Sequence, residues 1–258
     1  MSSKLTNIHP KAKIGNNVIV ESFTTIEEDV EVGNNCWIGP NVTIMKGARL
    51  GNNCKVFPGA VISAVPQDLK FGGEDSLVKI GDNTIIRENA TINRGTKYSG
   101  LTSIGKNCLI MAYVHVAHDC HISDHAILVN SVQLGGHVEI GEHAIIGGAS
   151  AVHQFVKIGE HSMISGGSLV RKDVPPFIKV AREPLAFIGV NNIGLERRGF
   201  SKEKIEEIQQ LYRLIFKSSY NNAQAIEKID NEYNQSPERD SIIKFIRTSE
   251  RGIIKGLK

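Results

Sequence analysis

The chain has 258 residues, 41% of them hydrophobic and 22% charged, which is enough for one large domain and a smaller one around apolar cores. Its net charge of +3 is small, and Lys and Arg are scattered through the first two thirds, so a nucleic-acid-binding protein is not expected. No apolar run approaches the roughly 20 residues that cross a bilayer, and no charged-then-apolar leader precedes the pattern that begins at Ile8, which predicts a cytoplasmic protein without stable membrane insertion.

The first two thirds of the chain repeat with a period of six residues. An aliphatic residue fills every sixth position, and a small residue lies two positions before it, so each hexad holds two inward residues separated by an outward one. The aliphatic residues are Ile8, Ile14, Val20, Ile26, Val32, Ile38, Ile44, Leu50, Val56, Ile62, Ile80, Ile86, Ile92, Ile104, Ile110, Val116, Ile122, Leu128, Leu134, Ile140, Ile146, Val152, Ile158, Ile164 and Val170. This spacing is typical of short strands, and turn residues fill the rest of each hexad. We predict a solenoid of parallel strands stacked about 4.8 Å apart.

The hexads resemble those of the hexapeptide-repeat acyltransferases, in which three hexads form one coil of a triangular prism. The resemblance implies a left-handed parallel β-helix, although parallel crossovers are in general right-handed. The four cysteines, Cys36, Cys54, Cys108 and Cys120, all occupy the small inward position, which predicts packing roles. Because no CxxC spacing occurs, neither a zinc site nor a redox pair is expected, and a nucleophilic role for Cys120 is the less favoured alternative.

The repeat is interrupted twice and then stops. Breaks near 66–77 and 95–103 predict loops, which on a rigid scaffold tend to carry binding residues. After DVPPF, which ends at Phe177, no further hexads occur.

The last part of the chain has the spacing of helices. Ser201 is a plausible N-cap, and an apolar stripe follows it, formed by Ile205, Ile208, Leu211 and Ile215. Further helices are expected around 223–233 and 240–249. We predict a mainly β protein, with a β-helix over 1–184 and an α-helical domain over 185–258 that covers the open end of the solenoid.

Eight of the nine histidines lie between His115 and His161. His125, His143 and His161 recur every 18 residues, each directly after an acidic residue, and so predict a ladder along one edge of the prism. Such a ladder could bind a metal ion, but its place at turns beside solvating acids favours an exposed or subunit-facing column. No metal site is therefore expected.

A second group of polar residues mixes side chains of different chemistry. The hexads VAHDCH, LGGHVE and VHQFVK place His118 below Gly136 and Asp119 below His137. A neutral imidazole can take a proton from a hydroxyl, and a carboxylate can stabilise the resulting cation, provided that His118 and Asp119 meet at a turn. The Gly136 amide could face a developing oxyanion. The group comprises His115, His118, Asp119, Gly136, His137, His153 and Gln154.

Longer motifs extend the resemblance to one family. AHDCHIS, GGHVEIGEHAIIGGASAVHQFVKIG, DVPPF, GVNNIGLERRGF and QDLKFGGE resemble the UDP-N-acetylglucosamine O-acyltransferases, over essentially the whole chain. The resemblance implies transfer of a 3-hydroxyacyl chain from acyl carrier protein to the 3-hydroxyl of UDP-N-acetylglucosamine, the first step of lipid A biosynthesis. It also implies a cytoplasmic homotrimer with active sites between neighbouring prisms. No acyl-enzyme is implied, and no cofactor beyond the phosphopantetheine arm of the carrier protein.

The same resemblance implies roles for individual residues. His118 would be the general base, Asp119 its electrostatic partner and the Gly136 amide the oxyanion donor. Gly166, which has no side chain, would leave the acyl groove open for a long chain. The implied substrate-binding residues are His137 and His153 for sugar or diphosphate, His115 for the acyl and pantetheine path, Gln154, Asn191, Arg197 and Arg198 for the nucleotide, and Asp68 and Lys70 for sugar and phosphate.

Four alternatives stay open. An N-acyltransferase later in the same pathway shares the hexads and a histidine base, but it carries an extra N-terminal uridine-binding domain, whereas hexads here begin at Ile8. An enzyme that acylates a 3-amino sugar nucleotide could use the same base and scaffold. A zinc hexapeptide-repeat carbonic anhydrase needs a histidine spacing that does not occur here, and a non-catalytic solenoid should show uniform ladders on its faces.

Overall fold

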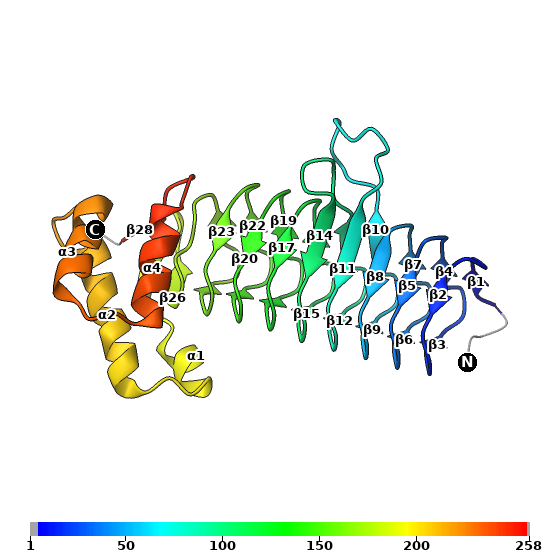
Figure 1. The fold of residues 1–258 in the computed structure, drawn as a ribbon, viewed down its shortest axis with the longest axis horizontal. Coiled ribbons are helices and arrows are strands. Elements are labelled where there is room, and N and C mark those ends of the chain that lie inside the picture. The colour runs from blue at the N-terminus through cyan, green and yellow to red at the C-terminus, as the bar shows by residue number, and fades with distance from the viewer. Residues whose placement is uncertain (1–4, 257–258) are drawn as a thin grey trace.

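The computed structural model describes residues 5–256, which form three β-sheets and four helices (Figure 1). The chain visits the three sheets in turn, so each sheet receives every third strand and forms one long face of a prism. Neighbouring strands of the coils pair in parallel, and paired residues are one coil apart, as where Asn7 lies opposite Thr25, 18 residues later. The predicted stacking of short parallel strands is confirmed.

The three faces are named in the order in which the chain meets them. The first face contains β1 (Asn7–Ile8), β4 (Thr25–Ile26), β7 (Thr43–Ile44), β10 (Val61–Ala64), β13 (Thr91–Asn93), β16 (His115–Val116), β19 (Gln133–Leu134), β22 (Ala151–Val152) and β25 (Leu169–Val170). The second face contains β2 (Lys13–Ile14), β5 (Glu31–Val32), β8 (Ala48–Leu50), β11 (Leu77–Ile80), β14 (Leu101–Ile104), β17 (His121–Ile122), β20 (Glu139–Ile140) and β23 (Lys157–Ile158).

The third face continues beyond the coils into the C-terminal part of the chain. It contains β3 (Ile19–Val20), β6 (Trp37–Ile38), β9 (Lys55–Val56), β12 (Ile85–Ile86), β15 (Leu109–Ile110), β18 (Ile127–Leu128), β21 (Ile145–Ile146), β24 (Met163–Ile164), β26 (Ile178–Ala181), β27 (Ala186–Val190) and β28 (Lys255–Gly256). β26 and β27 pair antiparallel, so the predicted domain boundary after residue 184 falls inside a hairpin.

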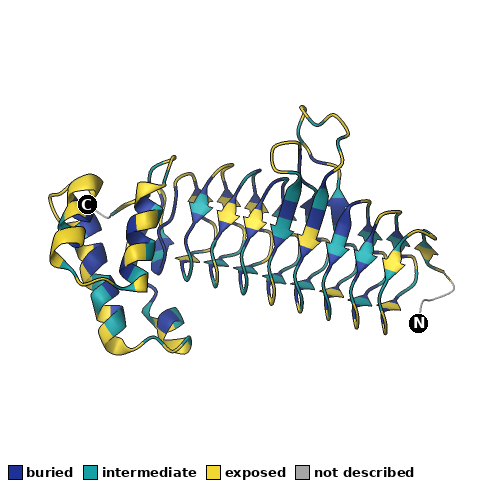
Figure 2. Ribbon diagram, in the orientation of Figure 1, coloured by how far each residue is buried: buried dark blue, intermediate teal, exposed yellow. Residues whose placement is uncertain are grey.

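The aliphatic residues of the hexads fill the inside of the prism. Ile38, Ile110 and Leu128 are fully buried, and Figure 2 shows buried residues recurring along the coils of the prism. Burying a side chain of this size contributes about 1.5–3 kcal/mol, repeated at each coil. The four cysteines are also buried and free, which confirms their expected packing position.

Three corners connect the faces, and each is a turn. The first corner joins the first face to the second and includes 118–119, 136–137 and 154–155. The second corner includes 124–125, 142–143 and 160–161, and the third includes 112–113, 130–131, 148–149 and 166–167. The last residue of each of these pairs has a positive φ, which turns the chain by one corner of the triangle.

Two loops leave the prism, both at the first corner (Figure 1). The long loop, 65–76, connects β10 to β11, and the short loop, 94–100, connects β13 to β14. The short loop ends earlier than the expected 95–103, because Leu101–Ile104 pair with Leu77–Ile80 and so extend the second face.

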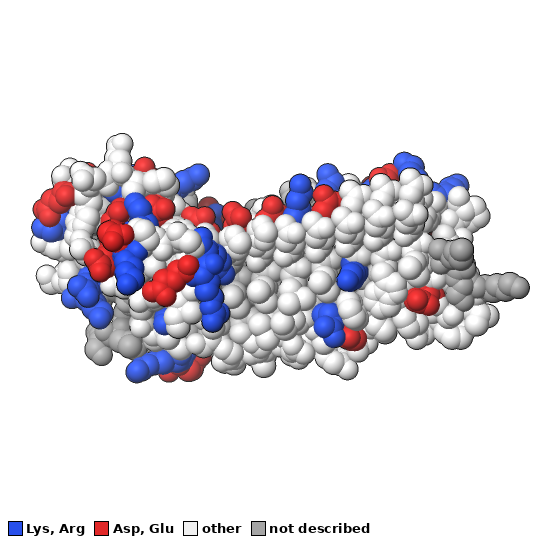
Figure 3. All heavy atoms as spheres, turned by 90° about the horizontal axis from the view of Figure 1, so that it is seen from below, with Lys and Arg blue, Asp and Glu red and all other residues white. Residues whose placement is uncertain are grey.

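The outward residues differ between faces. The second face carries charged side chains, among them Arg49, Lys79, Glu139 and Lys157. The third face carries Ile85, Leu109, Ile127, Ile145 and Met163 at the corresponding positions. Figure 3 views the molecule from the side of the third face, and the prism there is almost free of charge.

The helices gather at the far end of the prism: α1 (Asn192–Arg197), α2 (Lys202–Lys217), α3 (Asn222–Glu232) and α4 (Pro237–Arg247) (Figure 1). The three predicted helices are confirmed, and Ser201 caps α2 by accepting a hydrogen bond from the Lys204 amide. The Tyr212 hydroxyl donates to the carbonyl of Pro176 at 2.6 Å, which ties α2 to the last coil. Among residues 5–256, no helix is long and apolar enough to cross a membrane.

Candidate active site

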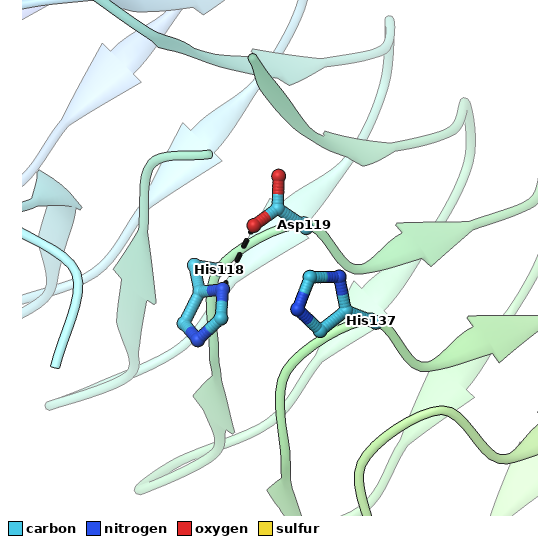
Figure 4. Close-up of side chains that lie close together, drawn as sticks. All are labelled: His118, Asp119 and His137. Carbon is cyan, nitrogen blue, oxygen red and sulfur yellow. Dashed lines mark hydrogen bonds and ion pairs between the residues drawn. The ribbon is translucent and has the colours of Figure 1, made fainter. Parts of the chain in front are cut away.

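His118 and Asp119 form an adjacent pair at the first corner, between β16 and β17. Nδ1 of His118 lies 2.8 Å from Oδ2 of Asp119 (Figure 4). Side chains of neighbouring strand residues point to opposite faces, but Asp119 has a φ of +57°, and this turn brings its carboxylate back to the imidazole. The condition for a direct contact, that the pair lie at a turn, is therefore met.

The carboxylate of Asp119 is fully buried and is held by the short loop. Thr96 donates to it from its amide and, at 2.7 Å, from its hydroxyl. Ser99 donates from its amide and its hydroxyl. Burial raises the pKa of Asp119, but the hydrogen bonds from Ser99, His118 and Thr96 outweigh it, and the pKa lies below its ordinary value. Asp119 is therefore a buried anion placed to orient His118 and stabilise its cation.

Gly136 lies one coil above His118 and in contact with its ring. A Cβ atom at Gly136 would lie 2.7 Å from Cε1 and 2.8 Å from Nε2 of His118, so a glycine is required for this approach. The Gly136 carbonyl accepts a hydrogen bond from the Phe155 amide, whereas its own amide has no hydrogen-bond acceptor among the described residues. An unpaired N–H next to an imidazole is an arrangement suited to an oxyanion.

His137 follows Gly136 and lies above Asp119. Its ring is 5.0 Å from that of His118 and nearly perpendicular to it, and Figure 4 shows it beside the pair. Burial lowers the pKa of His137, which favours a neutral ring. The structure thus brings together the three proposed catalytic residues and His137.

The other histidines of the group lie around this corner. His115 projects from β16, and its Nδ1 lies 2.8 Å from the Thr91 hydroxyl. Burial, with the neighbouring charge of His118, lowers the pKa of His115. His153 and Gln154 lie one coil higher and are exposed, with His153 Nδ1 3.1 Å from the Gln154 carbonyl oxygen.

The long loop contributes Asp68 and Lys70. The Asp68 carboxylate accepts a hydrogen bond from the Lys70 amide at 2.9 Å, and its charge is close enough to act on His137. The two loops hold each other, because the Glu74 carboxylate accepts from the Lys97 amide at 2.8 Å. Lys70 itself is exposed.

Within one chain, four expected substrate-binding residues lie away from His118. Asn191 donates to the His161 carbonyl at 2.9 Å and Arg198 to the His143 carbonyl at 3.1 Å, so both lie beside the second corner. Arg197, next to Arg198, is exposed at the end of α1. Gly166 lies at the third corner, with Gly148 beneath it.

Sequence reasoning missed the residues of the short loop that complete the site. Thr96 and Ser99 bind Asp119, and Tyr98 packs against His137. Beyond the loop, the Thr102 hydroxyl of β14 accepts a hydrogen bond from the Asp119 amide at 2.8 Å. The only signal in the sequence was the interruption of the hexads, which marks a loop but not what it contacts.

Two groups of side chains bring possible metal ligands within 4.8 Å of one another in residues 5–256: His118, Asp119 and His137, and His125, Glu142 and His143. In the first, Nδ1 of His118 already contacts Asp119. In the second, the rings of His125 and His143 are stacked 4.5 Å apart at 15°. A nitrogen binds a metal in the plane of its ring, so stacked rings direct their lone pairs side by side rather than toward one ion.

Cys120 follows Asp119 directly and carries a thiol. It is buried, and burial raises the pKa of its thiol to about 12. Since the thiolate is the reactive form, Cys120 is unsuited to attack a substrate at neutral pH.

Comparison with known proteins gives one consistent result. A family described as UDP-N-acetylglucosamine O-acyltransferase, domain 2, matches residues 173–254, and bacterial transferase hexapeptide repeats match 29–64 and 101–136. An acyl-[acyl-carrier-protein]–UDP-N-acetylglucosamine O-acyltransferase of Sulfurihydrogenibium is 51% identical over 256 residues, covering 96% of this chain and 94% of its own.

Solved structures agree with the sequence matches. A UDP-N-acetylglucosamine acyltransferase from Bacteroides fragilis superposes with a TM-score of 0.97 at 50% identity, covering 99% of this chain and 100% of its own. The Arabidopsis enzyme of the same name gives 0.85 at 33% identity, covering 99% and 100%. These matches identify the prism as a left-handed parallel β-helix, as expected. With half of its residues identical to relatives of the same length and shape, the chain belongs to the UDP-N-acetylglucosamine O-acyltransferase family.

Proposed function

We propose that this protein transfers a 3-hydroxyacyl chain from acyl carrier protein to the 3-hydroxyl of UDP-N-acetylglucosamine, the first step of lipid A biosynthesis. The observation that carries the proposal is the contact of His118 with buried Asp119 on one side and with Gly136 on the other. The names of the relatives and of the solved structures support the same acceptor and donor.

In the proposed reaction, His118 acts as general base. It removes the proton from the sugar hydroxyl as that oxygen attacks the thioester carbonyl, while Asp119 stabilises the imidazolium. The Gly136 amide donates a hydrogen bond to the oxyanion, and the proton then passes to the pantetheine thiolate as it leaves. No covalent acyl-enzyme forms, and no cofactor or metal takes part beyond the phosphopantetheine arm of the carrier.

We also propose that the active protein is a homotrimer with the third corner of each prism near the symmetry axis. The outward apolar residues of the third face would then be covered, while the charged second face stays in water. In that arrangement the first face of one chain meets the third face of the next, so the first corner of one adjoins the second corner of the other. Asn191 and Arg198 of a neighbouring chain would thereby reach the substrate held at His118.

The proposed substrate contacts follow from this arrangement. His137, His153 and Asp68 would bind the sugar and diphosphate, with Lys70 beside them. Gln154 of the same chain would bind the nucleotide together with the partner's Asn191, the partner's Arg197 and the partner's Arg198. Guanidinium groups are suited to a diphosphate. His115 and Gly166 would line the acyl path, and the open position at Gly166 favours a long chain. We place the enzyme in the cytoplasm, as the family resemblance implies.

The direct test is turnover with UDP-N-acetylglucosamine and its 3-amino analogue against a panel of 3-hydroxyacyl carrier proteins. The proposal expects ester formation with the hydroxyl sugar and preference for a long chain. Faster turnover of the 3-amino sugar would show that the acceptor is the 3-amino sugar nucleotide and not UDP-N-acetylglucosamine. An absence of acyl transfer to either sugar would overturn the proposed function.

A test of the shared site uses two inactive variants together. His118→Ala and Arg198→Ala proteins should each show little activity at low nucleotide concentration. Co-expressed with different affinity tags, they should form mixed trimers in which one of the three sites, about a third, combines intact His118 and Arg198 from neighbouring chains. Recovery of that share of activity is expected, and no recovery in purified mixed trimers would contradict a site between chains.

A further inference from the structure

His137 differs from the other histidines at the first corner in how its ring is held. His115, His118 and His153 each have a ring nitrogen within hydrogen-bond distance of Thr91, Asp119 or a backbone oxygen. The ring nitrogens of His137 make no hydrogen bond to any described residue, and its Nδ1 is buried. Something other than hydrogen bonding must therefore orient this imidazole.

Aromatic rings surround His137 instead. Phe155 stacks on it, with ring centroids 4.2 Å apart and an interplanar angle of 3°. Tyr98 meets it at 4.4 Å and 73°. Tyr98 and Phe155 are themselves 6.3 Å apart, so they contact different sides of the imidazole. Such contacts have preferred geometries and restrict the rotation of the ring between them.

We infer that Tyr98 and Phe155 are positioning residues, which hold the His137 ring in one orientation beside His118 and ready for the sugar nucleotide. This inference rests on the proposed function for its substrate. Tyr98 comes from the tip of the short loop, and the same loop binds Asp119 through Thr96 and Ser99. One loop would thus set the orientation of His118, through Asp119, and of His137, through Tyr98.

The electrostatic surroundings of His137 agree with this assignment. Burial is the largest influence on its pKa and lowers it, and the charge of His118 acts in the same direction. The carboxylates of Asp119 and Asp68 act in the opposite direction. The charges that act on His137 come from His118, Asp119 and Asp68, and neither Tyr98 nor Phe155 is among them. The rings therefore act by excluding water, which favours a neutral imidazole that can still accept or donate at its free nitrogen.

Removal of Tyr98 should leave the fold intact, because its side chain is 71% exposed. In Tyr98→Ala, the His137 ring should regain water and rotational freedom. Its pKa, followed by NMR titration of the free protein, should move up toward the ordinary histidine value. We expect kcat/KM to fall about tenfold, with a larger loss near pH 6 than near pH 8.

Three further variants make the test specific. Tyr98→Phe keeps the ring, so the pKa of His137 and the value of kcat/KM should equal those of the unmodified protein. Phe155→Leu keeps an apolar side chain without the flat stack and should resemble Tyr98→Ala. Tyr220→Ala removes an aromatic ring that is 41% exposed near α3, far from His137 in the chain, and should change neither property.

An unchanged His137 titration in Tyr98→Ala would overturn the inference, as would a Tyr98→Phe variant as slow as Tyr98→Ala. These outcomes differ from failure of the proposed function, which would appear as absence of acyl transfer by the unmodified protein. The NMR titration needs no turnover and would test the role of Tyr98 in either case.

Discussion

His118 and Asp119 are neighbours in sequence and yet bonded through their side chains, with Nδ1 and Oδ2 2.8 Å apart. The left-handed backbone conformation at Asp119 makes this possible, and the short loop holds the carboxylate in place through the hydroxyls of Thr96 and Ser99. The ring of His118 is therefore fixed at one nitrogen and meets Gly136 with the other.

Replacement of His118 by alanine should lower kcat by about three orders of magnitude, as expected when a general base is lost. Folding should be unaffected, because the ring lies at a corner and outside the aliphatic core. Steady-state kinetics and the melting temperature would be measured together. His121→Ala is the control, since His121 projects from the second face and contacts Ser103. Retention of near-full rate would remove His118 from the mechanism.

Replacement of Ser99 by alanine should reduce stability in a pH-dependent way. The pKa of Asp119 is lowered, so its contribution to stability is complete above the ordinary carboxylate pKa and is lost as pH falls through the folded-state value. Loss of a hydrogen bond to a charged group costs about 1.5–3 kcal/mol, so the variant should be less stable by that amount at neutral pH. The deficit should shrink as the pH falls through the lowered folded-state pKa of Asp119, where the carboxylate becomes protonated.

Urea unfolding of the Ser99 variant at several pH values would measure this deficit. Ser123→Ala is a matched control, because Ser123 lies at the second corner and its hydroxyl makes no hydrogen bond to a described residue. A deficit of equal size at all pH values would mean that Ser99 does not act through the charge of Asp119.

Replacement of Gly136 by alanine should displace the His118 ring. The added Cβ would come within 2.8 Å of two ring atoms, and relief of such overlap typically costs about 1–3 kcal/mol. Because a displacement of about 1 Å can cost 100-fold in rate, we expect a loss of that order in kcat/KM. Gly72→Ala, which meets only the Glu74 carboxylate at 3.5 Å, should be harmless. Full activity of the Gly136 variant would argue against close contact during turnover.

A charge on the third face should disrupt the proposed trimer. Ile127→Glu places a carboxylate among outward apolar residues, and burial of an unpaired charge in an interface is strongly unfavourable. Sedimentation velocity should show dissociation or weakened association. Lys79→Glu, on the charged second face, should sediment as the unmodified protein does. A trimer that survives the Ile127 substitution would place the interface elsewhere.

The coils were predictable because their physics is local and repeated. Each hexad specifies its own strand and turn, so Ile110 and Leu128 could be assigned to the interior without knowledge of their partners. The stacking of His118, Gly136 and Gln154 followed from the same period. The hairpin of β26 and β27 was not predicted, since it occurs where the period ends and pairing is set by tertiary contacts.

The contacts of the short loop could not be predicted for the same reason. Nothing in the spacing of Thr96, Tyr98 and Ser99 indicates that they contact residues 20 or more positions later in the chain. The positions of Asn191 and Arg198 have a different explanation, because a single prism places them at another corner, and only the association of chains would bring them to His118.

Both loops leave at the first corner, and the coils on either side still pair in parallel: Ile80 lies opposite Leu50 on one side and Ile104 on the other. Segments inserted at this corner thus change length while β11 keeps a regular register with β8 and β14, and the pairing of β10 with β13 shifts only at its end, between Ile62 and Ala64. The scaffold therefore tolerates changes of length in the long loop, and acceptor preference could be redesigned there by grafting, while the short loop keeps Thr96 and Ser99 on Asp119.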